Sequence, residues 1–437
     1  MKRTITPFFC DDLELTKSKM LHWSKQFSES VWLDSNQYPS DHHRFECVLA
    51  AEAVSMLRFS DNGSFDALRQ YMIEKQDWLF GFLGYDLKND VEPLVSNQID
   101  NIGLPDLLFF QPKRLWVCKD NHFEAHYPEE EDAAQDWQDI QAFQVPSEIS
   151  TTDPIQLAPK MSSDQYKEKA ASLLNHIRRG DIYEVNFCME WYAYQTGFKP
   201  YQIFSELNRV SKAPFAALMH VDDYFLMCTS PERFLKKQNH TLWSQPIKGT
   251  ASREADHLLD QAQAQRLSTD SKEQAENIMI VDLVRNDLSR VAKKGSVKVV
   301  EKCKVYAFEQ VHQMISTVSA TLAPAYDAVD ALCACFPMGS MTGAPKVRAM
   351  ELIETHELSK RGLYSGALGY FTPEGDFDFN VVIRSLIYND DTGYLSLHVG
   401  SALTAEADPQ KEYEECLLKA KAIREVLQAP NSVNLNL

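Results

Sequence analysis

Hydrophobic and polar positions after residue 160 follow two different periods, which indicates a chain of mixed helices and strands. In one segment the apolar residues recur at the 3.6-residue spacing of an amphipathic helix: Tyr166, Ala170, Leu173, Leu174 and Ile177. Ser162 and Gln165, three positions apart, form the pattern of a capping box, and Gly180 is placed to end the helix. A strand-like run, IYEVNFCMEWYAY, follows this predicted helix.

The same patterning predicts two further long helices, at about residues 271–291 and 410–426. Gly-rich turns and strand-like runs lie between them: FPMGSMTGAPK, RGLYSGALGYF, DFNVVIRSLIY and YLSLHVGSALT. Upstream, WLFGFLGYDL at residues 78–87 alternates small and large residues, as a buried strand does. The patterning after residue 160 therefore predicts an α/β fold.

A polar, acidic segment with prolines near its ends, residues 128–154, is the best candidate for a domain boundary. We therefore predict an N-terminal region of residues 1–155 and a catalytic domain of residues 156–430. The tail after Gln428 has the composition of a frayed end.

Composition narrows the class of protein. Of the 437 residues, 44% are hydrophobic and 24% charged, as in soluble globular proteins. A formal net charge of −18 argues against a nucleic-acid partner but leaves a small anionic substrate open. We expect no membrane span and no signal peptide, because long apolar runs are absent. Nine scattered cysteines without a CxxC pair favour reduced thiols and a cytoplasmic location.

Two pairs of glutamates lie on predicted helices. Glu273 and Glu276 share one helix face, and Glu412 and Glu415 share a face of the C-terminal helix. The simplest interpretation is two solvated acidic faces. However, Glu276 directly precedes the apolar run IMIVDLV, which favours a buried helix end, where paired carboxylates need a cation. A ligand set of oxygen atoms alone favours Mg²⁺.

Lys248 and Glu232 are candidates for acid–base or nucleophilic chemistry. Lys248, in SQPIKGTASR, lies between a strand-like run and a Gly-Thr turn. A single lysine is usually exposed, but at this position desolvation would lower its pKa and make the amine nucleophilic. Glu232, in TSPERF, ends a strand and suits a general acid; an ion pair with Arg233 or another cation is an equal alternative.

The segment MGSMTGAPKVRAMELIE resembles a phosphate loop only superficially, because its Gly and Lys spacing does not match GxxxxGK[ST]. Two interpretations remain. The turn presents backbone N–H groups to an anion, or glycine is needed there only for the geometry of a helix start.

Eight segments in one order resemble the chorismate-binding enzyme family: GDIYEVN, TSPERF, PIKGT, AENIMIVDLVRNDLSRV, GAPKVRAMELIE, YSGALGY, the strand that contains Arg384, and EYEECLLKAKAI. Members include the large subunits of anthranilate and aminodeoxychorismate synthases, isochorismate synthases and salicylate synthases. The resemblance covers about residues 160–427. Upstream, VWLDS, with Asp34 and Ser35, is similar to an element of the tryptophan pocket of relatives.

The resemblance implies an α/β fold with two large, mostly antiparallel β-sheets packed against each other and helices outside. It implies that Glu276 and Glu415 hold Mg²⁺, supported by Glu273 and Glu412, and that the metal binds the ring carboxylate of chorismate. The remaining substrate-binding positions that it implies are Arg384 and Tyr364 for the other carboxylate, and Gly249, Thr250 and the backbone of Gly400, Ser401 and Ala402 along the substrate.

Lys248 distinguishes branches of the family, because anthranilate synthases resemble PIAGT where aminodeoxychorismate synthases carry PIKGT. The resemblance therefore implies that Lys248 attacks C2 of chorismate while Glu232 protonates the departing 4-hydroxyl. Ammonia then attacks C4, which gives 4-amino-4-deoxychorismate for p-aminobenzoate and folate synthesis.

No glutamine amidotransferase signature is visible in the sequence, so we expect ammonia to come from a separate glutaminase subunit or from solution. Two alternatives remain. One is an anthranilate synthase large subunit, and the other is a catalytically silent binding subunit. Retention of the four glutamates together with Lys248 and Glu232 disfavours the silent subunit.

Three positions depart from the pattern of the family. Gln313 stands at a usual histidine position, the GAG turn reads Gly400-Ser401-Ala402, and the strand after GDIY reads EVNFCMEW where relatives carry a QVNLTQ-like sequence. These differences bear on substrate positioning and leave Lys248 and the four glutamates in place.

Overall fold

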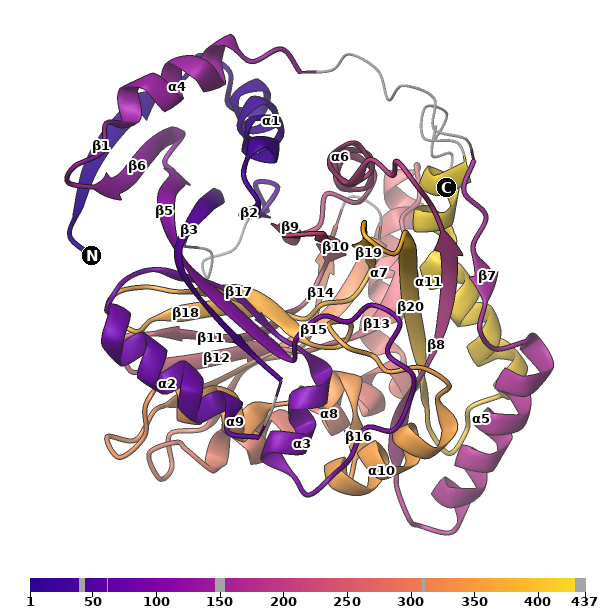
Figure 1. The fold of residues 1–437 in the computed structure, drawn as a ribbon. Helices are drawn as coiled ribbons and strands as arrows, with labels where there is room; N and C mark the ends of the chain where they lie inside the picture. Colours follow the sequence, from indigo (N-terminus) through magenta and orange to yellow (C-terminus); the bar gives the residue numbers. More distant parts are fainter. Residues whose placement is uncertain (39–43, 61, 146–153, 309–310, 429–437) are drawn as a thin grey trace.

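The computed structural model describes residues 1–38, 44–60, 62–145, 154–308 and 311–428. Antiparallel pairings join its twenty strands into one continuous sheet, which is bent into two halves (Figure 1). The first half contains, in spatial order, β7 (Ala158–Pro159), β8 (Glu184–Tyr194), β20 (Tyr394–Leu403), β19 (Ser385–Asn389), β10 (Tyr224–Ser230), β9 (Phe215–Val221), β2 (Glu29–Asp34), β3 (Cys47–Phe59), β5 (Leu107–Lys119), β6 (His122–Pro128) and β1 (Arg3–Phe9). The short β16 (Gly343–Ala344) pairs with β8.

The second half begins where β4 pairs with β5. Its strands are β4 (Leu79–Leu83), β17 (Ala367–Phe371), β18 (Phe377–Asn380), β11 (Arg233–Gln238), β12 (Thr241–Gln245), β15 (Val311–Thr321), β13 (Ile247–Ser252) and β14 (Lys298–Ala307). The predicted fold class is confirmed. The long strand β5 pairs with β3 and β6 in the first half and with β4 in the second, so it joins the two halves through hydrogen bonds.

Eleven α-helices flank the sheet in the described part of the chain. On the first half lie α1 (Leu13–Trp23), α4 (Ala133–Ala142), α5 (Ser163–Arg178), α6 (Pro200–Ser211), α10 (Lys346–His356) and α11 (Pro409–Gln428). On the second half, α7 (His257–Thr269) and α8 (Ser271–Ser289) pack against β13, β14 and β15. Helix α9 (Ala328–Cys335) packs against α8 and α2 (Ser64–Lys75), α2 also packs on β3 and β5, and the short α3 (Lys88–Val91) follows β4. Three 3₁₀ turns complete the set: η1 (Ser24–Gln26), η2 (Tyr85–Leu87) and η3 (Gly339–Met341).

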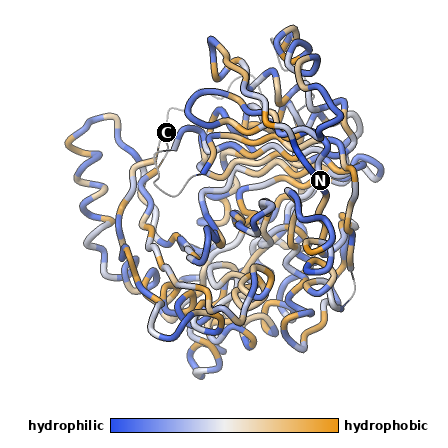
Figure 2. The backbone as a smooth tube through the Cα atoms, turned by 90° about the vertical axis from the view of Figure 1, so that its left-hand side faces the viewer, coloured by the Kyte–Doolittle hydropathy of each residue, from blue (hydrophilic) through white to orange (hydrophobic). Residues whose placement is uncertain are grey.

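Two hydrophobic cores follow from this layering. One combines buried side chains of both halves, such as Leu226, Phe109 and Phe379, with the inner faces of α8 and α9. The other lies between the first half and its helices, and includes Leu173 and Ile423. Figure 2 shows the same segregation, with hydrophobic stretches gathered along the strands and hydrophilic ones along the outer helices and loops.

Several predicted elements are confirmed. Helix α5 has both hydrogen bonds of the Ser162–Gln165 capping box, and α8 and α11 end within a few residues of their predicted bounds. The predicted strand at residues 78–87 is too long, because β4 ends at Leu83 and η2 follows after Gly84. All nine cysteines are free, and no described helix is long and apolar enough to cross a membrane.

The predicted boundary segment contains α4, whose buried Ala133 and Ile140 belong to a core, and residues 146–153 lie outside the described part. Strands from either side of it pair with each other, β2 with β9 and β4 with β17. The division at residue 155 stays a prediction.

Candidate active site

Lys248 lies on β13, where the start of α8 packs against the strand. Asn277 of α8 donates hydrogen bonds to the backbone carbonyls of Lys248 (3.4 Å) and Met314 (3.2 Å), which fixes the backbone on both sides. The Lys248 side chain is 14% exposed, so it is not the ordinary surface lysine. Its Nζ donates a 2.7 Å hydrogen bond to Oε1 of Glu184.

The expectation of a lowered pKa at Lys248 is wrong for this structure. Burial lowers the pKa of the amine, but the negative charges of Glu184 and then Glu276 outweigh that effect and raise it above the usual value. The lysine therefore rests as an ammonium ion among carboxylates.

Glu232 lies in the turn between β10 and β11 and is 5% exposed. Burial raises the pKa of its carboxyl to about 7, against the opposing effects of the Ser340 hydroxyl and the Lys248 charge. The Arg233 guanidinium pairs with Asp378 at 2.8 Å, which disfavours the alternative of an ion pair between Arg233 and Glu232. A carboxyl with such a pKa holds its proton at neutral pH about half the time, as a general acid requires.

The two glutamates of α8 lie beside the PIKGT turn. Oε2 of Glu273 is 3.1 Å from the place where a Cβ on Gly249 would lie, and the φ of Gly249 is +93°. Glycine thus lets the turn approach the helix closely. Burial raises the pKa of Glu276, and the charges of Glu184 and Glu415 raise it further.

The two glutamates of α11 differ in their surroundings. Glu412 is 6% exposed, and burial followed by the charge of Glu415 raises its pKa to about 7. The side chain of Glu415 is 46% exposed; partial burial disfavours its ionised form, but Lys419, at 2.6 Å, lowers its pKa. Because the charge of Glu415 acts on Lys248, Glu273 and Glu276, the two helices direct carboxylates toward one region.

This donor set fits Mg²⁺. Within the described residues, no group of three or more histidine, cysteine or carboxylate side chains forms a ready metal cluster. Mg²⁺ does not need one, because it typically takes one or two carboxylates, several waters and a substrate anion. Glu276 and Glu415 offer oxygen atoms only, and the mutual repulsion that raises the pKa of Glu276 is what a divalent cation would cancel.

Arg384 and Tyr364 lie together near α11. The ring of Tyr364 is buried and stacks on His398, with 5.1 Å between the centroids. Arg384 has a φ of +52°, and its guanidinium donates a 3.0 Å hydrogen bond to the carbonyl of Lys419. Burial lowers the pKa of Arg384, while Tyr364 and Glu415 oppose that shift, which shows that these groups are neighbours.

Gly400, Ser401 and Ala402 lie on β20 and pair with β8. A Cβ on Gly400 would collide with the Cys188 sulfur and would lie 2.7 Å from Oδ1 of Asn186, so the position requires glycine. The Ser401 hydroxyl bonds to Tyr166 of α5 at 2.8 Å, so its side chain faces the outer helices and only its backbone faces inward. Thr250, opposite Gln313 in the strand register, is exposed.

Sequence reasoning missed Glu184, the first residue of β8. It is 1% exposed, and its Oε2 has no hydrogen-bond partner among the described residues. The sequence feature that could have indicated it is the run EVN after GDIY, where the resembling sequences carry QVN. The Gly-rich segment lies next to it, because Gly343 approaches the Glu184 carbonyl more closely than any side chain would allow. Lys346 pairs with Asp287 at 2.6 Å, which supports the structural interpretation of that segment.

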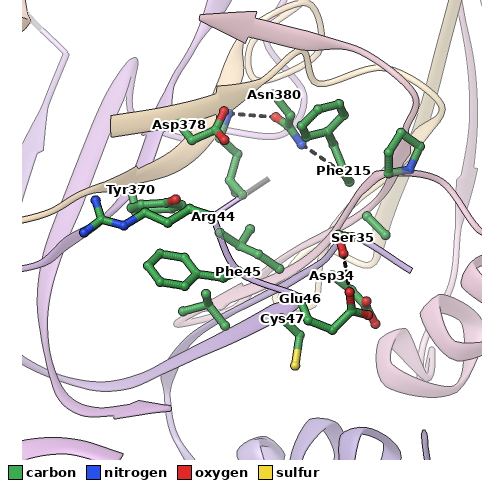
Figure 3. A pocket seen from close by; sticks show the side chains of 15 residues that line it. Asp34, Ser35, Arg44, Phe45, Glu46, Cys47, Phe215, Tyr370, Asp378 and Asn380 are labelled. Atoms are coloured by element: carbon green, nitrogen blue, oxygen red, sulfur yellow. Dashed lines mark hydrogen bonds between the residues drawn. The ribbon is translucent and has the colours of Figure 1, made fainter. Parts of the chain in front are cut away.

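A separate cavity of about 60 Å³ lies between β2, β3, β9, β17 and β18 (Figure 3). Asp34 and Ser35 line it, together with Arg44 and Phe45. Lys17 places its ammonium 2.8 Å from Asp34, so the chain supplies its own cation at this acidic end. None of the residues predicted for catalysis lines this cavity.

The antiparallel α/β fold and the convergence of Lys248, Glu232 and the helix carboxylates define a class of enzyme. The chain belongs to the chorismate-binding enzyme family, whose model matches residues 24–425. It is 35% identical over 361 residues to aminodeoxychorismate synthase component 1 of Escherichia coli (strain K12), which covers 81% of this chain and 77% of the relative.

Two further relatives support the family assignment. Anthranilate synthase component 1 of Thermus thermophilus is 33% identical over 358 residues, with 80% of this chain and 77% of the relative covered. The crystal structure of anthranilate synthase component I from Streptococcus pneumoniae TIGR4 has a TM-score of 0.77 at 27% identity, and covers 88% of this chain and 93% of that one.

Proposed function

We propose that this enzyme aminates chorismate at C4 to give 4-amino-4-deoxychorismate, the precursor of p-aminobenzoate in folate synthesis. The observation that carries the proposal is Lys248, half-buried in the candidate site where anthranilate synthases carry alanine. The relative from Escherichia coli, named aminodeoxychorismate synthase component 1, supports the same activity.

The proposed chemistry has two displacements. The neutral amine of Lys248 forms a bond to C2, the two conjugated ring double bonds both shift toward C4, and the C4–O bond breaks as Glu232 protonates the departing hydroxyl to water. Ammonia then forms a bond to C4, both double bonds shift back, and the C2–N bond to Lys248 breaks. The pKa of Glu232, about 7, supports its role as the acid.

Glu276 and Glu415 are proposed to hold Mg²⁺, with Glu273 and Glu412 nearby. A bound Mg²⁺ would supply charge neutralisation at the ring carboxylate of chorismate. Arg384 and Tyr364, which lie together beside α11, are proposed to bind the second carboxylate. Ammonia is proposed to come from a separate glutamine-hydrolysing subunit, as the words "component 1" in the names of relatives suggest.

Product analysis tests the proposal. The purified chain is incubated with chorismate, Mg²⁺ and ammonia, and the expected product is 4-amino-4-deoxychorismate without pyruvate. Stoichiometric pyruvate with anthranilate fluorescence would instead identify an anthranilate synthase, and absence of any turnover would identify a silent subunit.

Lys248→Ala tests the covalent route. The variant should keep chorismate binding, because the proposed metal site and Arg384 remain, and should lose the adduct. Mass spectrometry after incubation with chorismate and Mg²⁺, without ammonia, should show an adduct on the peptide with Lys248 in the unsubstituted enzyme only. If no adduct is trapped and Lys248→Ala aminates C4 as fast as the parent, the lysine only positions substrate.

A further inference from the structure

Glu184 is a buried carboxylate that, among the described residues, one side chain neutralises closely. Its Oε1 accepts the 2.7 Å hydrogen bond from Nζ of Lys248, whereas its Oε2 is buried without a partner among the described residues. The carboxylate sits at the first position of β8, where the family pattern has glutamine. Glutamine offers an amide at this place, whereas glutamate offers a group that takes up a proton.

Because the ion pair of Glu184 and Lys248 is buried, the balance between its ionic and its neutral form depends on how much water reaches it. Burial of a carboxylate costs desolvation free energy. When one of its oxygens has no hydrogen-bond partner, a single ion pair offsets that cost only in part. When substrate binds beside the pair and excludes water, the neutral pair of amine and carboxylic acid becomes more favourable relative to the two ions. Transfer of one proton along the existing 2.7 Å hydrogen bond produces that pair.

We propose that Glu184 is the base that removes the proton from Lys248 and thereby produces the nucleophile. The inference rests on the proposed function, and specifically on attack by Lys248. It also answers the difficulty that the resting lysine is an ammonium ion, which has no lone pair for attack.

Over one turnover, the protons gained and lost by Glu184 and Glu232 balance. Glu184 takes a proton from the ammonium of Lys248, and Glu232 gives a proton to the departing hydroxyl, which leaves as water. Ammonia bonded to C4 carries an extra proton, which passes to the Glu232 carboxylate. The amine of Lys248 leaves C2 and takes its proton back from Glu184, so both carboxyl groups return to their starting forms.

Other charged groups act on the pair from every neighbouring element. Glu276 of α8 and Glu415 of α11 stabilise the ammonium form of Lys248, and the Lys248 charge in turn acts on Glu232 in the β10–β11 turn. Lys419 of α11 pairs with Glu415 and reduces its influence. Among the carboxylates in the described part of the chain, Glu184 is the one that accepts a hydrogen bond from Lys248, so it is the acceptor that the geometry selects.

The test compares Glu184→Gln with the unsubstituted enzyme in two measurements. The first is the rate of adduct formation on Lys248, by rapid quench and mass spectrometry with chorismate and Mg²⁺ but without ammonia. Between about pH 5.5 and 7 the parent rate should stay flat, because the proton moves within the pair. The Glu184→Gln rate should rise about tenfold per pH unit, and at about pH 6 it should be roughly 100-fold lower than the parent rate.

The second measurement is competitive acetylation of Lys248 without substrate. Glu184→Gln removes a negative charge from the amine, so its pKa falls and acetylation at a given pH becomes faster. Faster acetylation together with slower adduct formation is the signature of a lost base. If adduct formation is as fast as in the parent or faster, Glu184 only anchors the ammonium ion and the proposal is overturned.

Glu190→Gln is the matched control, because Glu190 lies on the same face of β8 and is also buried. Its Oε1 accepts hydrogen bonds from Tyr394 and Ser396, so the substitution should leave both measurements unchanged. Should Glu184→Gln fail to fold, Glu184→Asp replaces it, and a retained base then predicts a slower rate that is still flat with pH. An unsubstituted enzyme that forms 4-amino-4-deoxychorismate without any adduct would overturn the Lys248 route and this inference, but not the reaction.

Discussion

Glu232 and Glu412 have the same raised pKa of about 7 for different reasons. Burial alone raises the pKa of Glu232, against the effect of nearby positive charge. Burial and then the charge of Glu415 raise the pKa of Glu412. Bound Mg²⁺ would therefore lower the pKa of Glu412 strongly, because it neutralises the carboxylates of that cluster. The pKa of Glu232 would stay raised, because burial causes that shift, and its carboxyl would remain able to donate a proton.

The rate of adduct formation should fall above about pH 7 in the unsubstituted enzyme. A general acid with a pKa near 7 is protonated below that pH and loses its proton above it. Glu232→Gln should remove this decline and slow the step by roughly 10²- to 10⁴-fold. A pH–rate profile by rapid quench measures both effects, and an unchanged decline in Glu232→Gln would assign it to another group.

Gly400→Ala should destabilise the protein by about 1–3 kcal/mol, because the added methyl overpacks the contact between β20 and β8. Urea unfolding measures the change. Cys188→Ala combined with Gly400→Ala should restore part of the loss, since it removes the sulfur that collides with the new methyl group. Full stability of Gly400→Ala would contradict the close approach.

Sequence motifs identified Lys248 and Glu232 but gave Lys248 the wrong shift in pKa. The reason is that Glu184, distant along the chain on β8, supplies the nearest charge, and β8 and β13 are not paired strands, so only the tertiary fold brings the two residues together. Sequence spacing predicts which residues are neighbours within one helix, such as Glu273 and Glu276. It does not predict which residues of different elements are neighbours.

Helices α8 and α11 each contribute one proposed metal ligand. Glu276→Gln or Glu415→Gln should abolish activity at limiting Mg²⁺ while circular dichroism shows a folded protein, because each substitution removes a charged oxygen ligand. Asp282→Asn on α8 and Glu414→Gln on α11 are matched controls at exposed positions of the same helices. Near-normal turnover of either ligand variant at limiting Mg²⁺ would refute the assignment.

The capping box of α5 should contribute measurably to stability. Ser162→Ala removes the side-chain acceptor for the Gln165 backbone N–H and should cost about 1 kcal/mol. Thermal or urea unfolding measures this loss. Ser163→Ala, one position into the helix, is the control, and an equal effect of both substitutions would show that the cap is not responsible.

Elements with strong periodicity were predictable, whereas weakly patterned ones were not. The stripe of apolar residues on α5 specified the helix and its buried face. Helix α4 was missed because only Ala133 and Ile140 of its ten residues are buried, so its polar sequence resembled a linker. Strand β4 ended early because the chain leaves β5 after Gly84: the Tyr85 N–H bonds to the carbonyl of Gly362 and the Leu87 N–H bonds back to that of Gly84. The contact with Gly362 is one that local patterning does not contain.

At the scale of the whole molecule, the purified chain should use ammonia but not glutamine. Production of 4-amino-4-deoxychorismate from glutamine should appear only when a glutaminase subunit is added, because the sequence shows no amidotransferase motif. Chromatographic product analysis with each nitrogen source measures this dependence. Glutamine-dependent product from the chain alone would contradict it.

The continuous sheet also constrains how the protein is made on the ribosome. Residues 79–83 of β4 complete their ladder only with residues 367–371 of β17, and β2 needs β9. Nascent chains therefore hold open strand edges until most of the polypeptide has emerged, which exposes them to pairing with other chains. Contacts between such distant segments also make folding slow. During synthesis, the edge of β4 therefore stays unpaired until residues 367–371 of β17 emerge and close the sheet.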